Sequence, residues 1–447
     1  MKPSPGAEAL LADLGRRGLA EAEIFEKSGR SRRFVREAGG VDPEGSVRMT
    51  QAMATEAGWA LRAGDRRRSL FCAATGSADP GLELPEPSPH PLRLPDPTMA
   101  AGGTVLDAGG GPWSAPAEFD TPLATESVAA TLLSSIEREL RRELPGSRLR
   151  QAWLEDGAAE WTLLSTSGLR AESRARAAYL RLEVEDRGRR CLFEGAEREA
   201  RRFEPRALAL RLADRLSALA DNGERSATGV VAPGLPLLLA APLAARLVQA
   251  LAPLFLGPAA SDRLLALGAF SAALSLVDDG RLAEGVLVSP VDGEGLPSGR
   301  VRLVEQGRFV QPLLAWWEAG RAAVPGCARR ASWRDLPRRA PTHLFVEPGP
   351  TPVADLVEAG GAGAYLLDAE GAVRIDPSSL AFEVAVSGLH LAAGRAVSPL
   401  GRVRLCGDVA GLLAGIRELG RDLSFVPGDG MFGAPSMLVS GLRVLAG

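Results

Sequence analysis

The chain has 447 residues, of which 46% are apolar and 24% are charged, a balance that excludes wholesale disorder and a multi-span membrane protein. Its 52 basic and 55 acidic residues give a net charge of −3, so no overall positive field draws the chain to nucleic acid. The four cysteines lie far apart in no paired spacing, which excludes zinc ribbons and small disulfide scaffolds.

The first elements predicted are a helix and several strands. Apolar residues recur at helical spacing over residues 7–19 and predict a short amphipathic helix. Alternating patterns then predict strands over residues 22–26 and 31–36, and a hairpin over residues 58–75 that turns at residues 63–65. We expect these elements to belong to a mixed helix and sheet domain.

The next stretch, residues 76–122, is rich in proline and glycine and predicts a connector or loop within this domain. Regular patterns resume after it, with Ser127 as the predicted N-cap of the next helix. They predict a helix, two strands joined by a Ser-Thr-Ser-Gly turn, and a second helix over residues 125–144, 148–165, 170–185 and 205–220.

A run of turn-forming residues at 221–225 (DNGER) predicts a boundary between an N-terminal domain, residues 1–222, and a C-terminal domain, residues 223–447. The second part predicts strands over residues 282–288, 300–305, 342–347, 363–367, 382–386 and 437–445, and helices over residues 235–256 and 409–419. Many short strands with glycine-rich turns indicate a β-rich, sandwich- or barrel-like domain with appended helices. The fold class predicted for the whole chain is α+β.

The apolar segment 235–256 is long enough to span a bilayer. Arg246 stands near its centre, however, and prolines interrupt it. A central arginine costs about 2.5–3.5 kcal/mol on membrane insertion. We therefore predict a buried helix and no membrane partner. The N-terminal residues lack a signal-peptide pattern, so a cytoplasmic location is expected.

The sequence offers little for a metal site. Its three histidines are His90, His343 and His390, and the nearest two are 47 residues apart, so no helix can present a histidine pair. A site assembled from His343, His390 and Cys406 remains an alternative. The competing interpretation is a buried strand histidine and a small buried thiol.

Nucleophilic and phosphate-binding patterns are also missing. No GxSxG or GxxxxGK[ST] sequence occurs. Cys327, followed by Arg329 and Arg330, is a candidate thiol nucleophile, because neighbouring arginines can lower a thiol pKa. The other arginine clusters are short and dispersed, which indicates solvated surfaces and no direct nucleic-acid contact.

In its sequence landmarks the chain resembles the TldD/PmbA family, also called modulators of DNA gyrase. In the first half these are AEIFEKSGRSRRFVREAG, GWALRAGDRRRSLFCAATG and LLSTSGLRAE. In the second half they are DNGERSATGVV, LVDDGRLAEG, SPVDGEGLPSGRVRLVEQGRF, GCARRAS, PTHLFVEPG, the run from SGLHLAAG to GRDL, and GAPSMLVSGLRVLAG. The matches span nearly the whole chain in the expected order.

The resemblance implies one of two branches. The TldD branch is a metallopeptidase whose helix carries HExxxH, with zinc bound by the two histidines and by a cysteine near the C-terminus, and with the glutamate as general base. In this chain Gln249, Ala250 and Leu254 stand where HExxxH would be, and residues 427–431 (PGDGM) stand in the cysteine region. These departures resemble the TldE/PmbA branch, so we expect no metal ligand and no catalytic residue in this chain.

The resemblance therefore implies a non-catalytic subunit of a heterodimeric metalloprotease that acts on unfolded peptides. Its partner would be a TldD-like subunit that carries the zinc, and the isolated chain could form a homodimer. The alternatives are a stand-alone peptidase with a non-standard site and a peptide-binding or regulatory protein. Candidate contact residues in the most family-like loops are Asp292, Glu294, Arg329 and Arg330.

Overall fold

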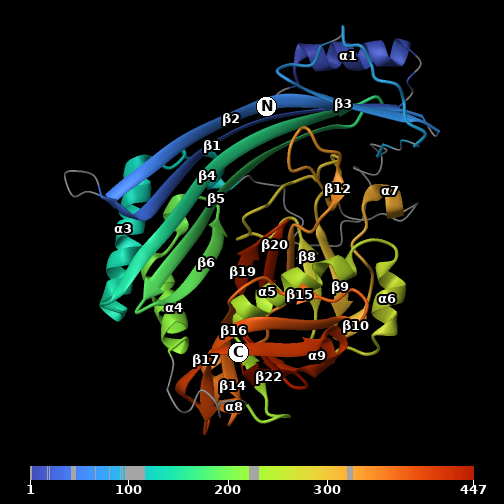
Figure 1. Cartoon of the computed structure of the whole chain (residues 1–447). Helices are drawn as coiled ribbons and strands as arrows, with labels where there is room; N and C mark the ends of the chain where they lie inside the picture. The colour runs from blue at the N-terminus through green and yellow to red at the C-terminus, as the bar shows by residue number, and fades with distance from the viewer. Residues whose placement is uncertain are drawn as a thin grey trace.

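A computed structural model of the chain (Figure 1) describes residues 3–17, 19, 21–41, 47–65, 67–79, 81–90, 92, 94–95, 116–220, 231–319 and 326–446. The fold is α+β, as predicted. One long sheet and its helices form the N-terminal unit, and the described residues from 231 onward form a β-rich C-terminal unit with two large sheets and a two-stranded ribbon. The predicted domain boundary at residue 222 falls outside the described residues.

The N-terminal unit is built on a six-stranded antiparallel sheet in the order β3-β2-β1-β4-β5-β6. Its strands are β1 (Glu21–Val41), β2 (Val47–Gly64), β3 (Ser69–Thr75), β4 (Ser147–Ser165), β5 (Arg170–Asp186) and β6 (Arg189–Glu197). The four longest strands curve together as an arch over the C-terminal unit (Figure 1). The strands predicted at residues 22–26 and 31–36 are one continuous strand, because both pair with β2 and β4 in a single register.

Helices cover one face of this arch. They are α1 (Pro5–Arg16), α3 (Glu126–Glu143) and α4 (Pro205–Ala218), with the short 3-10 turns η1 (Ala117–Asp120) and η2 (Ala200–Arg202) beside them. Ile136 and Leu140 of α3 pack with Leu154 and Leu180 of the sheet, which lie on the same face of their strands. The N-cap of α3 is Thr125, whose side chain accepts a hydrogen bond from the Val128 N–H; the prediction of Ser127 was wrong by two residues.

The C-terminal unit holds two main sheets. The first, in the order β10-β9-β8-β13-β20-β19, consists of β8 (Leu276–Asp279), β9 (Arg300–Glu305), β10 (Arg308–Phe309), β13 (His343–Val346), β19 (Ser424–Pro427) and β20 (Met431–Ala434). The second, in the order β18-β21-β7-β14-β16-β17-β22, consists of β7 (Leu237–Leu239), β14 (Ala364–Ala369), β15 (Arg374–Ile375, beside β16), β16 (Ala381–Ala392), β17 (Arg395–Asp408), β18 (Ile416–Leu419), β21 (Met437–Val439) and β22 (Arg443–Ala446).

The remaining elements connect these sheets. They are α5 (Ala241–Leu251), η4 (Ala252–Phe255), α6 (Ala260–Ala266), α7 (Trp316–Ala319), the ribbon β11 (Ala328–Arg329) and β12 (Arg338–Arg339), α8 (Val353–Ala359) and α9 (Val409–Gly415). The helix α5 contacts strands of both sheets, and its apolar residues belong to the one large core that both sheets share. Burial on several sides explains why its sequence is apolar nearly all round.

Several predicted elements differ from the structure. The segment 235–256 is a strand, a helix and a 3-10 turn in succession rather than one helix. Residues 409–419 are likewise α9 followed by β18, residues 437–445 contain two strands, and residues 282–288 form turns instead of a strand. Arg246, the reason for doubting a membrane helix, pairs with Asp368 at 2.9 Å. No helix within the described ranges is long and apolar enough to cross a membrane.

Candidate functional site

The structure brings together the two segments where the family metal site would stand. Gln249, in the last turn of α5, donates a hydrogen bond from Nε2 to the Pro427 carbonyl at 3.2 Å. The adjacent Gly428 has no room for a side chain, because a Cβ there would lie 2.4 Å from Gln249 Nε2 and 2.8 Å from the Phe432 ring. The Gln249 amide and Gly428 thus lie in direct contact, which leaves no space between the helix end and the loop.

This locus does not fit a zinc ion. Ala250 has no donor atom, and Leu254 lies in η4, where its side chain is buried in the apolar core. Across the described parts of the chain, no three His, Cys, Asp or Glu residues lie close enough to share a metal. Zinc sites are built from several sulfur, imidazole and carboxylate donors, whereas the one carboxylate of this loop, Asp429, is exposed and pairs with Arg338 at 3.1 Å.

The alternative metal set from the sequence is not assembled. His343 lies in β13, in one sheet, whereas His390 and Cys406 lie in the other. Cys406 pairs with Glu383, which lies seven positions from His390 along β16, roughly 23 Å at about 3.3 Å per residue. His343 Nε2 accepts from the Leu287 N–H at 3.2 Å, and Nδ1 is 2.9 Å from the Asp279 carbonyl. Burial lowers the pKa of His343 to about 4, so the ring is neutral and both nitrogens are occupied.

The candidate nucleophile Cys327 is an unreactive thiol. It is 2% exposed and donates from Sγ to the Leu314 carbonyl at 2.8 Å. Burial raises its pKa well above the usual range, and the carboxylates of Asp292 and Asp278 add to the effect. Thiolate is the reactive form, so this environment opposes nucleophilic catalysis.

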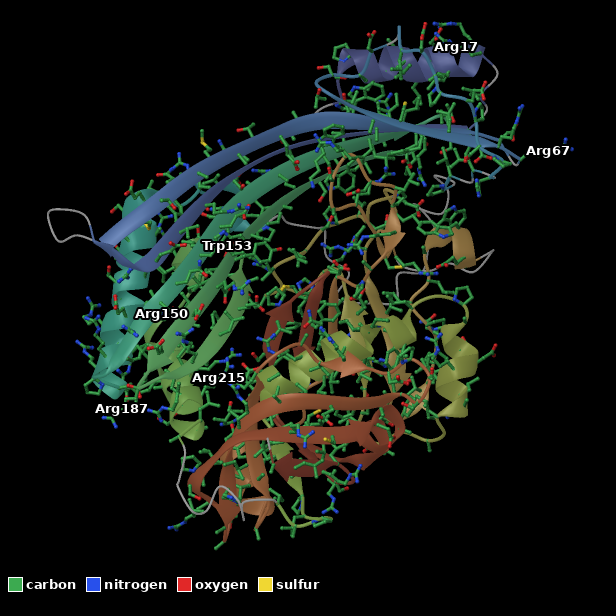
Figure 2. The ribbon with its side chains drawn as sticks, in the orientation of Figure 1. Arg17, Arg67, Arg150, Trp153, Arg187 and Arg215 are labelled. Atoms are coloured by element: carbon green, nitrogen blue, oxygen red, sulfur yellow. The ribbon has the colours of Figure 1, made fainter. Side chains whose placement is uncertain are left out.

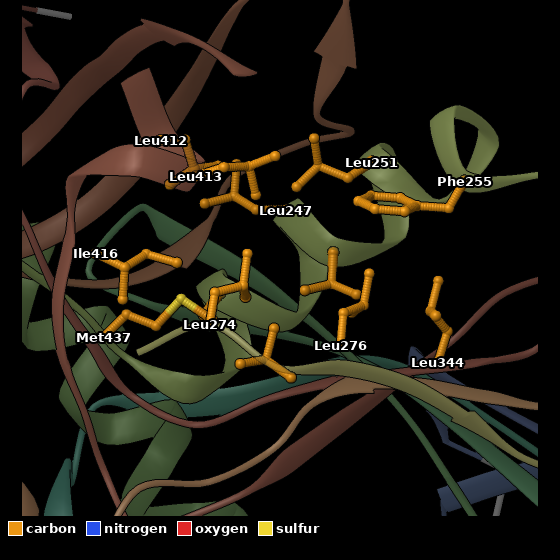
Figure 3. Close-up of a pocket in the computed structure, with 13 residues that line it drawn as sticks. Leu247, Leu251, Phe255, Leu274, Leu276, Leu344, Leu412, Leu413, Ile416 and Met437 are labelled. Carbon is orange, nitrogen blue, oxygen red and sulfur yellow. The ribbon is translucent and has the colours of Figure 1, made fainter. Parts of the chain in front are cut away.

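A small apolar cavity of ≈ 20 Å³ lies beside α5 (Figure 3). Figure 3 shows leucine side chains of α5, including Leu247 and Leu251, facing Leu276, Ile416 and Met437 across it. A cavity of this size holds about one water molecule, but a water needs two or more polar partners. The lining offers none, so this cavity is part of the core and not a ligand site.

Two of the predicted contact residues, Glu294 and Arg330, belong to a buried ionic network that joins the two units. Glu23 of β1 accepts two hydrogen bonds from Arg62 of β2, at 2.7 and 3.1 Å, and also pairs with Arg330. Arg62 reaches across to Glu294 at 3.1 Å. We call Glu23, Arg62, Glu294 and Arg330 the junction network; each side chain is 8% exposed or less.

The network sets the charge state of its members. Burial raises the pKa of Glu23, but Arg330 and Arg62 outweigh it, so the net shift is downward and Glu23 is charged. Burial raises the pKa of Glu294 above its usual range, and Arg62 only partly opposes this. The network therefore holds two arginines against one firmly ionised carboxylate.

The other two predicted residues, Asp292 and Arg329, line a cleft of ≈ 240 Å³ between the sheet of the N-terminal unit and the C-terminal unit. Asp292 accepts hydrogen bonds from the N–H groups of Glu294 (2.9 Å), Leu296 (3.0 Å) and Ala328 (2.9 Å), so its side chain shapes a loop. Arg329 is half-buried, and its side chain makes no hydrogen bond or ion pair with any described residue. Of the four predicted residues, it is the one whose side chain forms no hydrogen bond or ion pair with another described residue.

A second ionic cluster, which sequence reasoning missed, also joins the two units. Asp368 of β14 is 0% exposed and pairs with Arg215 (3.1 Å) and Arg211 (3.2 Å) of α4 and with Arg246 of α5. Arg215 lies where α4 meets the C-terminal unit (Figure 2). Three arginines outweigh burial and lower the pKa of Asp368, which keeps this carboxylate charged. No local signal marks Asp368, because its partners are more than 100 residues away in the chain.

Comparisons with known proteins agree with this architecture. Residues 234–446 match the family described as PmbA/TldA metallopeptidase C-terminal domain. A metalloprotease TldD homolog of Buchnera aphidicola is 26% identical over 163 residues, which is 36% of this chain and about a third (33%) of that relative's length.

Two solved structures extend the likeness over the whole fold. TldE from Thermococcus kodakarensis aligns over 98% of this chain and 100% of its own, with a TM-score of 0.78 and 16% identity. A putative modulator of a DNA gyrase from Thermotoga maritima aligns over 98% and 99%, with a TM-score of 0.74 and 16% identity. Residues 234–446 thus match the PmbA/TldA C-terminal domain, the whole chain shares the fold of these two structures, and the comparisons together support the TldD/PmbA family.

Proposed function

We propose that this chain is the non-catalytic, TldE-like subunit of a heterodimeric metallopeptidase that acts on unfolded peptides. The observation that carries the proposal is the contact between Gln249 and Pro427. It joins the helix end and the loop that would carry the family's zinc ligands, and the two segments hold no histidine or cysteine and only one carboxylate, Asp429, which pairs with Arg338. The metal and the general base would then come from a TldD-like partner.

A subunit without ligands can still contribute to peptide hydrolysis. Its sheet and its C-terminal unit enclose a cleft that a partner could extend. An extended peptide held there would reach the partner's metal with less loss of freedom than a free peptide in solution. This role requires a stable arrangement of the two units, which the junction network and the Asp368 cluster supply.

The proposal is tested by mixing this chain with the TldD-like protein of the same organism. We expect the two chains to co-elute in size-exclusion chromatography and an unfolded peptide to be cleaved faster by the mixture than by the TldD-like protein alone. If the TldD-like protein never binds this chain and cleaves equally well without it, the proposal is wrong. A homodimer of the isolated chain would be replaced by the mixed complex.

A further inference from the structure

The cleft between the two units carries unpaired positive charge. Its floor is the sheet, where Ala159 and Ala175 leave space and Phe25 and Trp161 stack with ring centroids 5.4 Å apart. Its opposite wall is formed by loops of the C-terminal unit, including residues 287–293 and 328–331. The cleft is therefore wide, partly aromatic and bounded by both units.

Arg329 is the main unpaired cation. It lies on β11, whose neighbour β12 carries Arg338, and Arg338 pairs with Asp429 at 3.1 Å in the loop beside Gln249. Arg329 itself has no such partner: the nearby Asp278 influences its charge, but no hydrogen bond or ion pair joins them. Burial lowers the pKa of Arg329, which reflects the cost of holding a charge there without a counterion.

Two further cations line the same cleft with donors to spare. The side chain of Arg330 is 1% exposed, and its Nη1 has no hydrogen-bond partner among the described residues. Lys27 of β1 donates from Nζ to the Ala331 carbonyl at 2.7 Å, and that acceptor carries no charge. An ammonium has three N–H donors, so this one bond does not saturate Lys27.

Arg330 pairs with Glu23, but the acidic groups near Arg329 form no ion pair with it. Asp278 accepts from the Thr342 N–H at 2.8 Å, and burial raises its pKa to about 7. Asp292 is held by three main-chain N–H groups, and burial raises its pKa as well. Main-chain donors thus occupy the carboxylates, and the arginines retain unpaired N–H groups.

We propose that the cleft binds a carboxylate of an extended peptide, with Arg329 as the anchor and with Lys27 and Arg330 contributing to the positive potential. A guanidinium matches a carboxylate with two parallel hydrogen bonds. The alanine floor admits a main chain, and the half-buried Trp161 beside it offers an apolar surface to the peptide. That the ligand is a peptide rests on the proposed function; the carboxylate rests on the cleft alone.

The test uses the full chain without any partner and three peptides of glycine, serine and alanine that carry an uncharged BODIPY dye. The first carries one glutamate and an amidated C-terminus, the second carries glutamine and an amidated C-terminus, and the third carries glutamine and a free C-terminal carboxylate. Anisotropy titrations give the three affinities. We expect at least one carboxylate peptide to bind about tenfold more tightly than the neutral one. Which one does so identifies a side-chain or a C-terminal carboxylate as the source.

The matched variants are Arg329→Gln and Arg334→Gln. Arg334 is exposed, stacks on Trp333 at 4.0 Å and lies outside the cleft. We expect Arg329→Gln to abolish the preference for the carboxylate, Arg329→Lys to retain part of it, and Arg334→Gln to leave it unchanged. A wild-type chain that does not distinguish the peptides, or an Arg329→Gln chain that still does, overturns the proposal.

Thermal unfolding separates loss of binding from loss of folding. Arg329 makes no bond that a substitution would break, so Arg329→Gln should unfold at or above the wild-type temperature. The preferred peptide should raise the unfolding temperature of the wild type and not that of Arg329→Gln. Because these measurements need no partner, a chain that binds carboxylates but never associates with a TldD-like protein would contradict the proposed function and leave this inference standing.

Discussion

The side-chain amide of Gln249 and the main-chain carbonyl of Pro427 lie 3.2 Å apart, in a hydrogen bond between α5 and the last residue of β19. The next residue is Gly428, and a Cβ atom at this position would overlap with the side chains of Gln249 and Phe432. The amide and the glycine therefore accommodate each other. Restoring a ligand in the loop would require changes on both sides.

The first prediction concerns this pair. Gly428→Ala should lower the free energy of unfolding by about 1–3 kcal/mol, because its Cβ overlaps with the buried Phe432 ring and with Gln249. Gln249→Ala alone should cost about 1 kcal/mol, the contribution of one hydrogen bond. In the double variant, the alanine at position 249 no longer overlaps with the new Cβ at position 428. Urea unfolding should therefore show a loss of free energy that is smaller than the sum of the two single-variant losses. Strictly additive costs would mean that the two residues are not in contact.

The second prediction concerns the junction network. Glu23→Gln should destabilise the chain by about 3–5 kcal/mol, because it leaves the buried Arg330 without a negative partner and Arg62 with Glu294 alone. The control is Glu305→Gln, in an exposed pair with Arg302, where the cost should be at most about 1 kcal/mol. Urea denaturation measures both.

The pH dependence of the same substitution has a defined sign. The folded-state pKa of Glu23 is lowered, so its contribution to stability is present above its ordinary value of 4.5 and is lost as the pH falls through the lowered folded pKa. The stability difference between wild type and Glu23→Gln should therefore shrink in acid. A difference that grows in acid would contradict an ionised Glu23.

The third prediction concerns Asp278, whose pKa burial raises from 3.8 to about 7. Between these two values the folded chain keeps a proton that the unfolded chain has lost, so stability falls as the pH rises. Asp278→Asn should remove the contribution of this group to the slope of the unfolding free energy against pH, which is at most about 1.4 kcal/mol per pH unit.

The control for Asp278 is Asp376→Asn. Hydrogen bonds from the Ser379 N–H and hydroxyl lower the pKa of Asp376, so its effect lies below pH 4. It should leave the slope between pH 4 and 7 unchanged. Chemical denaturation at several pH values measures both variants, and an unchanged slope in Asp278→Asn would show that Asp278 is ionised throughout.

The fourth prediction concerns the apolar cavity. Leu247 is 3% exposed, so Leu247→Ala should enlarge the cavity and cost about 2–5 kcal/mol. Leu247→Met conserves the volume and should cost less than about 1.5 kcal/mol. The denaturation midpoint should fall without a change in m. Equal costs for the two variants would mean that Leu247 does not line a packed core.

The parts of the fold that were predicted correctly are those with a local signal. The β4–β5 hairpin was found because its residues alternate over long strands and a Ser-Thr-Ser-Gly turn separates them. In residues 235–256 the same reasoning failed, because burial between two sheets makes strand, helix and 3-10 turn equally apolar. Pro242 and Pro253, at the starts of α5 and η4, were the available signals of these changes.

The candidate site residues also show that sequence patterns reveal local features but not long-range contacts. Asp292, Glu294, Arg329 and Arg330 were selected from family-like loops, and the structure places them together at the junction of the two units. In the sequence, their partners Glu23 and Arg62 resemble ordinary charged residues of a strand. The contacts join residues more than 200 positions apart in the chain, so no local pattern marks them. Neither pattern nor composition can pair charges over such distances. The absence of local histidine pairs, by contrast, was directly visible in the sequence.

The central claim is that this chain does not supply the catalytic metal. The most direct measurement is the zinc content of the purified chain alone and of its complex with the TldD-like protein, by inductively coupled plasma mass spectrometry after dialysis. The account predicts far less than one zinc per isolated chain and one zinc per heterodimer. One tightly held zinc per isolated chain, together with cleavage of an unfolded peptide by that chain, would contradict it.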